Sequence, residues 1–237
     1  MNNNRLYFQQ WLSGVDFGSN NQIAKQMRNF TYAVGDTETR ELLLIDPAYD
    51  VTSILDMVNM ENYQLSGILI THYHADHAGG SLMGIEIEGI REILQSNQVP
   101  IHINKEELNW MKRSTGIDES YFASHESGDK IKFGTIEATL IHTPGHTPGS
   151  QCFLIEDMLV SGDTLFLEGC GRTDLPGSDP EKMYESITTK LTKISDSVTL
   201  YPGHFYSDVP FESIAVTKEK NPVLQTMPKD QWLNFFT

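Results

Sequence analysis

The sequence predicts an α+β fold in which helices cover sheets that contain antiparallel strand pairs. Runs with strand and helix periodicity are intermixed along the 237 residues, without the regular alternation of a doubly wound sheet. No Pro-, Ser- or Gly-rich linker divides the chain, and no repeat is evident. Hydrophobic residues make up 39% of the chain and charged residues 21%, which is a globular balance. We therefore expect a single domain over residues 1–237.

The first predicted elements lead into one polar segment. Residues 29–35 and Glu41–Ile45 are apolar runs joined by a polar turn, which predicts a hairpin that ends at Asp46. Val51–Met60 has apolar residues at helical spacing. Residues 65–71 form a short apolar run that is typical of a buried strand.

The same periodicities predict the later elements. Residues 85–95 and 104–111 look helical on either side of a strand at 99–103. A helix over 180–194 is favoured because Asp179 suits the N-cap and Pro180 the first helical position. Strands are predicted at Lys130–Phe133, 135–142, Gln151–Ile155, 158–161 and 198–201. The rest is described as an N-terminal extension, residues 1–28, and a short C-terminal tail, residues 205–237.

Charge and hydropathy exclude two classes of partner. Acidic residues outnumber basic ones by 32 − 17 = 15, and no Lys/Arg block offers a footprint for nucleic acid. The chain has no run of about 18 apolar residues and no signal-peptide pattern. Cys152 and Cys170 are too few for a disulfide framework and fit a reducing compartment. We expect a cytoplasmic protein without nucleic-acid or membrane partners; a homo-oligomer is compatible with the sequence.

The segment from Thr71 to His77 packs three imidazoles and a carboxylate into six positions. Such groups are costly to bury together unless a cation organises them, and His with Asp are suitable ligands for a borderline divalent metal. In an extended or turning backbone, His72 and His74 point the same way, while Asp76 and His77 turn toward a second position. The segment therefore predicts two adjacent metal sites.

Three further ligand candidates, His146, Asp163 and His204, each follow a predicted strand closely. Both histidines come directly after Pro-Gly, and a Gly precedes the aspartate. Pro stiffens the approach and Gly relieves backbone crowding, so that a side chain can be aimed at a fixed point. Asp46 is either a partner of a ligand imidazole or part of an Asp-Pro turn. No ligand role is assigned to the remaining histidines, His102, His125 and His142.

The motif His72-x-His74-x-Asp76-His77, followed in order by His146, Asp163 and His204, resembles the metallo-β-lactamase superfamily. The resemblance covers about residues 29–206, most of the chain. It implies an αββα sandwich of two mixed sheets flanked by helices, with the metals at one edge. It further implies a first site from His72, His74 and His146, a second site from Asp76, His77 and His204, and Asp163 as the bridge.

Differences among the branches of this superfamily favour glutathione-linked sulfur chemistry. Class B β-lactamases use a Cys ligand at the second metal and lack the His that follows the motif Asp, whereas this chain has His77 and Asp163. Flavodiiron proteins have a motif with Glu at the position of His74. The ribonuclease branches are disfavoured because this acidic chain offers no basic face for RNA. Residues 164–174 and the His-Phe-Tyr ending at Tyr206 are similar to stretches of glyoxalase II and the persulfide dioxygenases. By that match Arg172 and Tyr206 are candidates for holding glutathione, with an ion pair and packing as their alternative roles.

The resemblance implies first a metal-dependent hydrolase of a small thioester, of the glyoxalase II (hydroxyacylglutathione hydrolase) type. Two divalent ions, most simply Zn²⁺, would lower the pKa of a water toward about 7. A thiol leaves with a pKa of roughly 8.5, so the reaction needs no strong acid. Asp76 is the candidate catalytic acid because the motif supplies no other. A mono-iron glutathione persulfide dioxygenase, with Fe(II) at His72, His146 and Asp163, is the alternative. A non-catalytic metal-binding module is a lesser one.

Two segments separate the chain from the glyoxalase II pattern. Only 237 − 204 = 33 residues follow His204, so we expect no helical C-terminal domain of the kind that full-length glyoxalase II uses to bind glutathione. Residues 82–94 lengthen the span after His77 and form a lid, a dimer contact or an extra helix. The acyl group, the metal and the oligomeric state stay open at the level of sequence.

Overall fold

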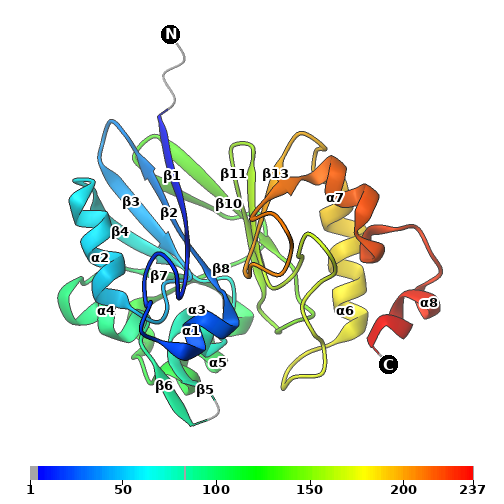
Figure 1. Cartoon of the computed structure of the whole chain (residues 1–237), viewed down its shortest axis with the longest axis horizontal. Coiled ribbons are helices and arrows are strands. Elements are labelled where there is room, and N and C mark those ends of the chain that lie inside the picture. The colour runs from blue at the N-terminus through cyan, green and yellow to red at the C-terminus, as the bar shows by residue number, and fades with distance from the viewer. Residues whose placement is uncertain (1–4, 83, 237) are drawn as a thin grey trace.

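Two six-stranded sheets face each other in a computed structural model that describes residues 5–82 and 84–236 (Figure 1). The first sheet has the order β1 (Leu6–Leu12), β2 (Phe30–Asp36), β3 (Glu41–Ile45), β4 (Gln64–Leu69), β7 (Ile101–Asn104), β8 (Phe122–His125). The second has the order β14 (Glu212–Ser213), β13 (Thr199–Pro202), β12 (Met158–Gly162), β11 (Gln151–Ile155), β10 (Ile136–His142), β9 (Lys130–Phe133). Both are mixed: β3 and β4 run parallel in the first, as β12 and β13 do in the second, beside antiparallel neighbours.

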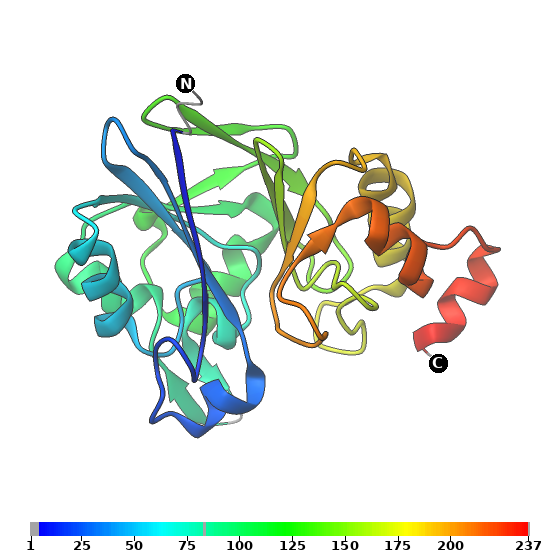
Figure 2. The same cartoon turned by 45° about the horizontal axis from the view of Figure 1, so that its top comes forward.

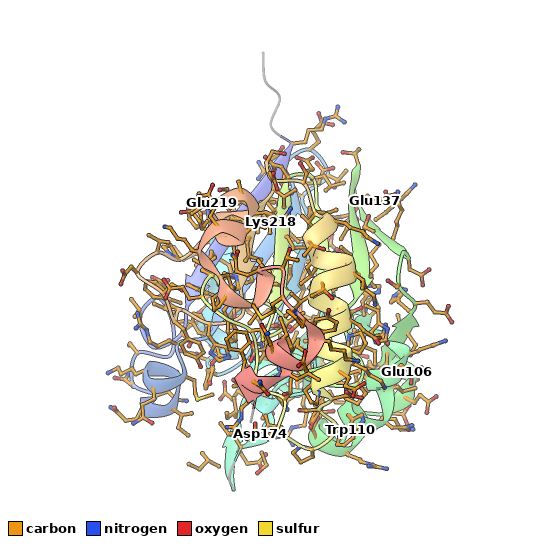
Figure 3. All side chains as sticks on the ribbon, turned by 90° about the vertical axis from the view of Figure 1, so that its right-hand side faces the viewer. Glu106, Trp110, Glu137, Asp174, Lys218 and Glu219 are labelled. Carbon is orange, nitrogen blue, oxygen red and sulfur yellow. The ribbon has the colours of Figure 1, made fainter. Side chains whose placement is uncertain are left out.

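Helices cover the outer face of each sheet, which makes the αββα sandwich that the resemblance implies. On the first sheet lie α2 (Val51–Met60), α4 (Ile90–Ser96) and α5 (Leu108–Thr115), with α1 (Gln22–Met27) and α3 (Ala75–Ala78) near one edge (Figure 1). On the second lie α6 (Pro180–Glu185), α7 (Ile214–Lys220) and α8 (Lys229–Leu233), which face the viewer in Figure 3. None of the helices in the described ranges is long and apolar enough to cross a membrane.

Alternation along the strands builds the layers of the core. Phe30, Tyr32 and Val34 on β2 face the second sheet and pack with Phe133 and Phe153 in an apolar interlayer. The opposite faces of the same sheets pack under the helices. Residues of β3 meet Ile54 and Val58 of α2, and residues of β12 and β13 meet Met183 of α6 and Ile214 of α7. The register of central strands such as β2 and β12 is therefore fixed by burial on both faces.

The hairpin and most of the other strands are confirmed. β2 and β3 are antiparallel, with Tyr32 opposite Ile45, and Asp36 accepts hydrogen bonds from two backbone amides of the turn. The helix over 180–194 is also confirmed, with Asp179 accepting at its N-cap from Glu181 N and Lys182 N. It changes from α6 to a wider π-helical turn at Ser186–Lys190 and a 3₁₀ turn at Leu191–Lys193.

The helical prediction for residues 85–95 is wrong at its start. Ile85–Ile87 form β6, which pairs antiparallel with β5 (Gly80–Leu82), and only Ile90–Ser96 are helical. The reason is local: Ile85 and Ile87 alternate with a glutamate, and Gly89 separates them from the helix. Ile90 and Ile93 of α4 are buried in the core, so residues 82–94 include a helix of the main sandwich. Met83 lies outside the described residues.

Several elements have no counterpart in the sequence prediction. β1 pairs with β2 from Leu6 opposite Asp36 to Leu12 opposite Phe30, so the N-terminal extension supplies an edge strand (Figure 2). Residues 1–4 of that extension lie outside the described residues. β8 completes the other edge, and the C-terminal tail contributes β14, α7 and α8. Trp232 on α8 donates its indole N–H to Val223 O within the tail, and it is buried in the cluster that contains Leu159 and Leu200 of the second sheet.

Candidate metal centre

The side chains predicted as ligands come together at one edge of the sandwich. β4 leads into the loop with His72 and His74, and the short helix α3 that follows carries Asp76 and His77. From the second sheet, His146 lies in the β10–β11 loop, Asp163 directly follows β12, and His204 follows β13. Loops at the ends of strands converge at an edge, so both sheets contribute donors to one place.

The donor atoms form two triads. His72, His74 and His146 make the first, and His74 Nδ1 faces His146 Nε2 at 3.0 Å. Asp76, His77 and His204 make the second, and their donor atoms lie between 3.3 and 3.6 Å from one another.

Asp163 lies between the triads. One of its carboxylate oxygens is 3.4 Å from His77 Nε2, and the other is 3.6 Å from His146 Nε2 and 3.3 Å from His204 Nε2. The structure thus brings all seven predicted side chains to one place, with Asp163 between the two triads.

The donor set fits divalent ions, as two buried atoms show. His72 Nε2 and Asp163 Oδ1 have no hydrogen-bond partner in the described part of the chain, although both are inaccessible to solvent. Burying a carboxylate oxygen and an imidazole nitrogen in this way is costly without a cation. Neutral imidazole nitrogens and carboxylate oxygens are suitable ligands for zinc and for iron.

Partners on the far side of each ring orient the imidazoles. His146 Nδ1 lies 2.8 Å from Arg172 O, and His204 Nδ1 lies 2.7 Å from Met27 O. A carbonyl oxygen can only accept, so Nδ1 donates in both rings and the lone pair of Nε2 points to the centre. Such contacts hold a ligand in the tautomer that binds a metal.

Asp46 is one of these partners. Its carboxylate lies 2.9 Å from His77 Nδ1 and accepts from Thr71 N at 2.8 Å and from the Thr71 hydroxyl. Thr71 Oγ1 in turn lies 3.0 Å from His72 Nδ1. Of the two roles left open by the sequence, the structure shows the hydrogen bond to a ligand imidazole.

Glu107 connects the loops of the first triad through hydrogen bonds, a role that sequence analysis missed. It is buried and accepts from Tyr73 N at 2.8 Å, from Thr147 Oγ1 at 2.7 Å and from Gly149 N at 2.6 Å. Tyr73 stands between His72 and His74, and Thr147 follows His146. Burial raises the pKa of Glu107 to about 7, although the three hydrogen bonds lower it.

Asn29 is the second residue that sequence analysis missed. It lies beside the second triad, with Nδ2 at 3.0 Å from Asp76 Oδ2, 3.2 Å from His77 Nε2 and 3.4 Å from His204 Nε2. The buried phenol of Tyr49 donates to Asn29 Oδ1 at 2.9 Å. A lone Asn at the start of a strand carries no signal in sequence that could have revealed this contact.

Burial and neighbouring charges shift the pKa values of the residues in this cluster in opposite directions. Burial and the neighbouring imidazoles lower the pKa of His72 well below its usual value. Burial also opposes the charged form of His77, but Asp163 and Asp76 raise its pKa well above the usual value. The imidazoles of His204 and His77 outweigh burial and lower the pKa of Asp163 well below its usual range. Asp163 is thus an anion, as a bridging ligand must be.

The two candidate substrate residues lie differently. The Arg172 guanidinium is exposed and bonds both oxygens of Asp174 at 2.6 and 2.7 Å. Asp174 lies at the lower edge of the molecule in Figure 3. Tyr206 is half exposed, and its ring stacks on the His204 imidazole with centroids 4.6 Å apart. The ion pair is the alternative role considered for Arg172, while Tyr206 places an accessible phenol beside the second triad.

The three histidines without an assigned role lie in other surroundings. His102 Nδ1 is 2.9 Å from His125 Nε2 on neighbouring strands, and His142 Nε2 is 2.9 Å from Pro148 O. Burial and His125 lower the pKa of His102 to about 4. None of the three belongs to a candidate metal cluster among the described residues.

An αββα sandwich with paired His/Asp triads at one edge defines a class of metal-dependent proteins. Residues 27–204 match the family model of the metallo-beta-lactamase superfamily. The chain belongs to this superfamily, as the motif predicts.

Relatives within the superfamily carry out different chemistry. The probable polyketide biosynthesis zinc-dependent hydrolase BaeB of Bacillus velezensis is 30% identical over 208 residues, 87% of this chain and 86% of the relative. The persulfide dioxygenase ETHE1 of Bos taurus is 31% identical over 82% of this chain and 71% of its own. A hydroxyacylglutathione hydrolase of Shewanella loihica is 30% identical over 83% and 69%. The crystal structure of ETHE1 from Myxococcus xanthus, 26% identical, covers 97% of this chain and 89% of its own with a TM-score of 0.77.

Proposed function

We propose that the protein is a metal-dependent hydrolase of a small thioester, of the glyoxalase II type, working in the cytoplasm with two Zn²⁺ ions. The observation that carries the proposal is the pair of complete triads joined by Asp163. The likeness to a zinc-dependent hydrolase and to a hydroxyacylglutathione hydrolase supports it. His72, His74 and His146 would hold one ion and Asp76, His77 and His204 the other.

A metal pair at such a centre supplies Lewis acidity, lowering the pKa of a water toward about 7 and polarising a carbonyl. The residues of the chain provide the rest. Asp163 and Asp76 concentrate negative charge where two cations would need it, and the carbonyl partners of His146 and His204 turn Nε2 of these rings inward. No nucleophilic side chain is required.

A thioester is the substrate class that suits these groups. The thiol leaves as a thiolate with a pKa of roughly 8.5, so the reaction needs no strong acid. Asp76, with one oxygen held by Asn29 Nδ2, is the carboxylate of the second triad that we assign to proton transfer. We assign Tyr206 and Arg172 to the glutathione part of the substrate. The Tyr206 phenol can hydrogen-bond a peptide group. The Arg172 guanidinium can bind a carboxylate of the substrate in place of Asp174.

A persulfide dioxygenase is the second candidate, favoured by the 31% identity to ETHE1. In that case His72, His146 and Asp163 would supply two histidines and one carboxylate, a set that suits a single Fe(II) with open positions. The same chain therefore holds donor sets for both reactions. The identity and number of the metals decide between them.

The test is the metal content after anaerobic purification without added metal, combined with two assays. We expect about two zinc ions per chain and thiol release from S-lactoylglutathione. The result that would instead favour the dioxygenase is about one iron per chain together with oxygen consumption on glutathione persulfide. Asp163→Asn is expected to lose metal and activity together, with Asp56→Asn, at an exposed position of α2, as the matched control. Full turnover by Asp163→Asn would contradict the bridging role.

A further inference from the structure

We propose that Asn29 controls occupancy of the second metal position: its side-chain amide competes with a cation for the donor atoms of Asp76, His77 and His204. The inference rests on the proposed metal centre and assigns to it a residue outside the ligand motif. Its consequence is a graded centre, in which the first position binds metal more tightly than the second.

The position of Asn29 Nδ2 carries the argument. The three donor atoms of the second triad lie 3.3 to 3.6 Å from one another. Nδ2 lies 3.0, 3.2 and 3.4 Å from the same three atoms, so it stands over the centre of their triangle. A cation held by that triad has to share this space with the amide.

The chemistry of the contacts is that of donor to acceptor. His77 Nδ1 faces the Asp46 carboxylate and His204 Nδ1 faces Met27 O, so both rings, in the neutral form that binds metal, present the Nε2 lone pair to Asn29. Asp76 presents a carboxylate oxygen. The amide group has two N–H hydrogens and no lone pair available to a metal, so it bonds these acceptors and repels a cation.

A buried phenol fixes the amide in this orientation. Tyr49 OH donates to Asn29 Oδ1 at 2.9 Å, which turns the oxygen away from the triad and the N–H₂ toward it. Tyr49 and Asn29 are 3% and 2% exposed, so neither group can exchange its partner for water. The cost of metal entry is therefore the loss of the hydrogen bonds from Nδ2, the one to Asp76 being charge-assisted.

The first triad lacks such a competitor. His72 Nε2 is buried without any partner in the described ranges of the chain. A cation there satisfies His72 Nε2, which has no other bond, and replaces only the contact of His74 Nδ1 with His146 Nε2 inside the triad, whereas at the second triad it also displaces the amide of Asn29. The two positions thus differ in affinity through one amide.

The experiment is a calorimetric titration of the metal-free full chain with Zn²⁺ at one fixed pH. The wild type is expected to bind two ions in two steps, the second weaker. Asn29→Ala is expected to tighten the second step about 10-fold, which corresponds to removing ~1.4 kcal/mol of competing hydrogen bonding, and to leave the first unchanged. Asn29→Asp keeps the shape of the side chain, supplies an anionic oxygen and is expected to tighten it further. Asn20→Ala, at an exposed asparagine, is the control and should match the wild type.

Two further outcomes separate this inference from the proposed function. Tyr49→Phe releases the amide oxygen without touching the triad, and it is expected to tighten the second step by a smaller factor. A second step that weakens or stays the same in Asn29→Ala and Asn29→Asp overturns the inference while leaving the metal centre in place. Failure of the wild type to bind any zinc overturns both.

Discussion

Replacing Glu107 by Gln tests whether a buried carboxyl group links the stability of this protein to pH. Glu107 is buried, and its pKa is about 7, against 4.5 for an exposed glutamate. Between these two values the unfolded chain loses the proton while the folded chain keeps it. The contribution of Glu107 to stability is therefore greatest below pH 4.5 and falls as the pH rises toward 7, because at this group the folded state binds more protons.

The magnitude follows from the two pKa values. At about 1.36 kcal/mol for each pH unit, the interval from 4.5 to 7 corresponds to about 3 kcal/mol in the free energy of unfolding. Gln cannot ionise, so Glu107→Gln lacks this contribution. Its amide also meets N–H donors where the carboxylate accepted from Tyr73 and Gly149, so the variant is expected to be less stable than the wild type at low pH.

The assay is urea denaturation of metal-free wild type and variant across this pH range. The difference between the two free energies of unfolding cancels the titration of the histidine cluster, which both proteins share. It is expected to shrink by about 3 kcal/mol as the pH rises from 4.5 to 7. Glu106→Gln, at the exposed neighbouring position, is the matched control. A constant difference between wild type and Glu107→Gln would refute the reasoning.

Three other substitutions probe the centre, the core and the surface. Asp46→Ala removes the partner of His77 Nδ1 and is expected to weaken zinc binding about 10–100-fold in a competition titration with a chelator; unchanged affinity would rule out that support. Phe153→Ala empties a fully buried position in the interlayer and is expected to cost about 3–5 kcal/mol in the free energy of unfolding, measured by denaturation, where a loss under 1 kcal/mol would contradict the packing. Arg172→Ala breaks an exposed ion pair, so the free energy of unfolding should change by less than about 1 kcal/mol. Its KM for S-lactoylglutathione should rise several-fold at similar kcat, and an unchanged KM would remove Arg172 from the substrate site.

The convergence of the ligands could be predicted from sequence because the signal is local and chemical. Three imidazoles and a carboxylate between His72 and His77 have few uses other than metal binding, and Pro-Gly marks His146 and His204 as aimed side chains. Their order along the chain then matches a known family.

The residues that support the ligands could not be found in this way. Glu107 stands in a polar stretch beside another glutamate, and its burial arises only when α5 docks against two loops from different sheets. Asn29 gains its contacts through strand pairing that brings Met27, Asn29 and His204 together. Such roles depend on tertiary contacts, which periodicity does not record.

The missed strands have the same physical origin. β1 contains two glutamines in the sequence LYFQQWL, which blurs the alternation expected of a strand, and it is stabilised by its antiparallel pairing with β2. Ile85–Ile87 is too short to show a period by itself, and its neighbours suggested a helix. Local pattern was sufficient where burial repeats over a longer segment, as in Val51–Met60, or where a short strand alternates clearly, as in Lys130–Phe133.

The centre straddles the seam between the two halves of the sandwich. Leu69 on β4 and Val160 on β12 face each other's sheet across the interlayer, and each precedes a ligand, His72 or Asp163, by three residues. A shift of one sheet over the other would therefore change the distances between the ligand atoms that the two sheets supply. The apolar interlayer between the sheets therefore sets the distances between the ligand atoms. Substitutions in this interlayer, far from the edge, should alter which metal ions the protein binds.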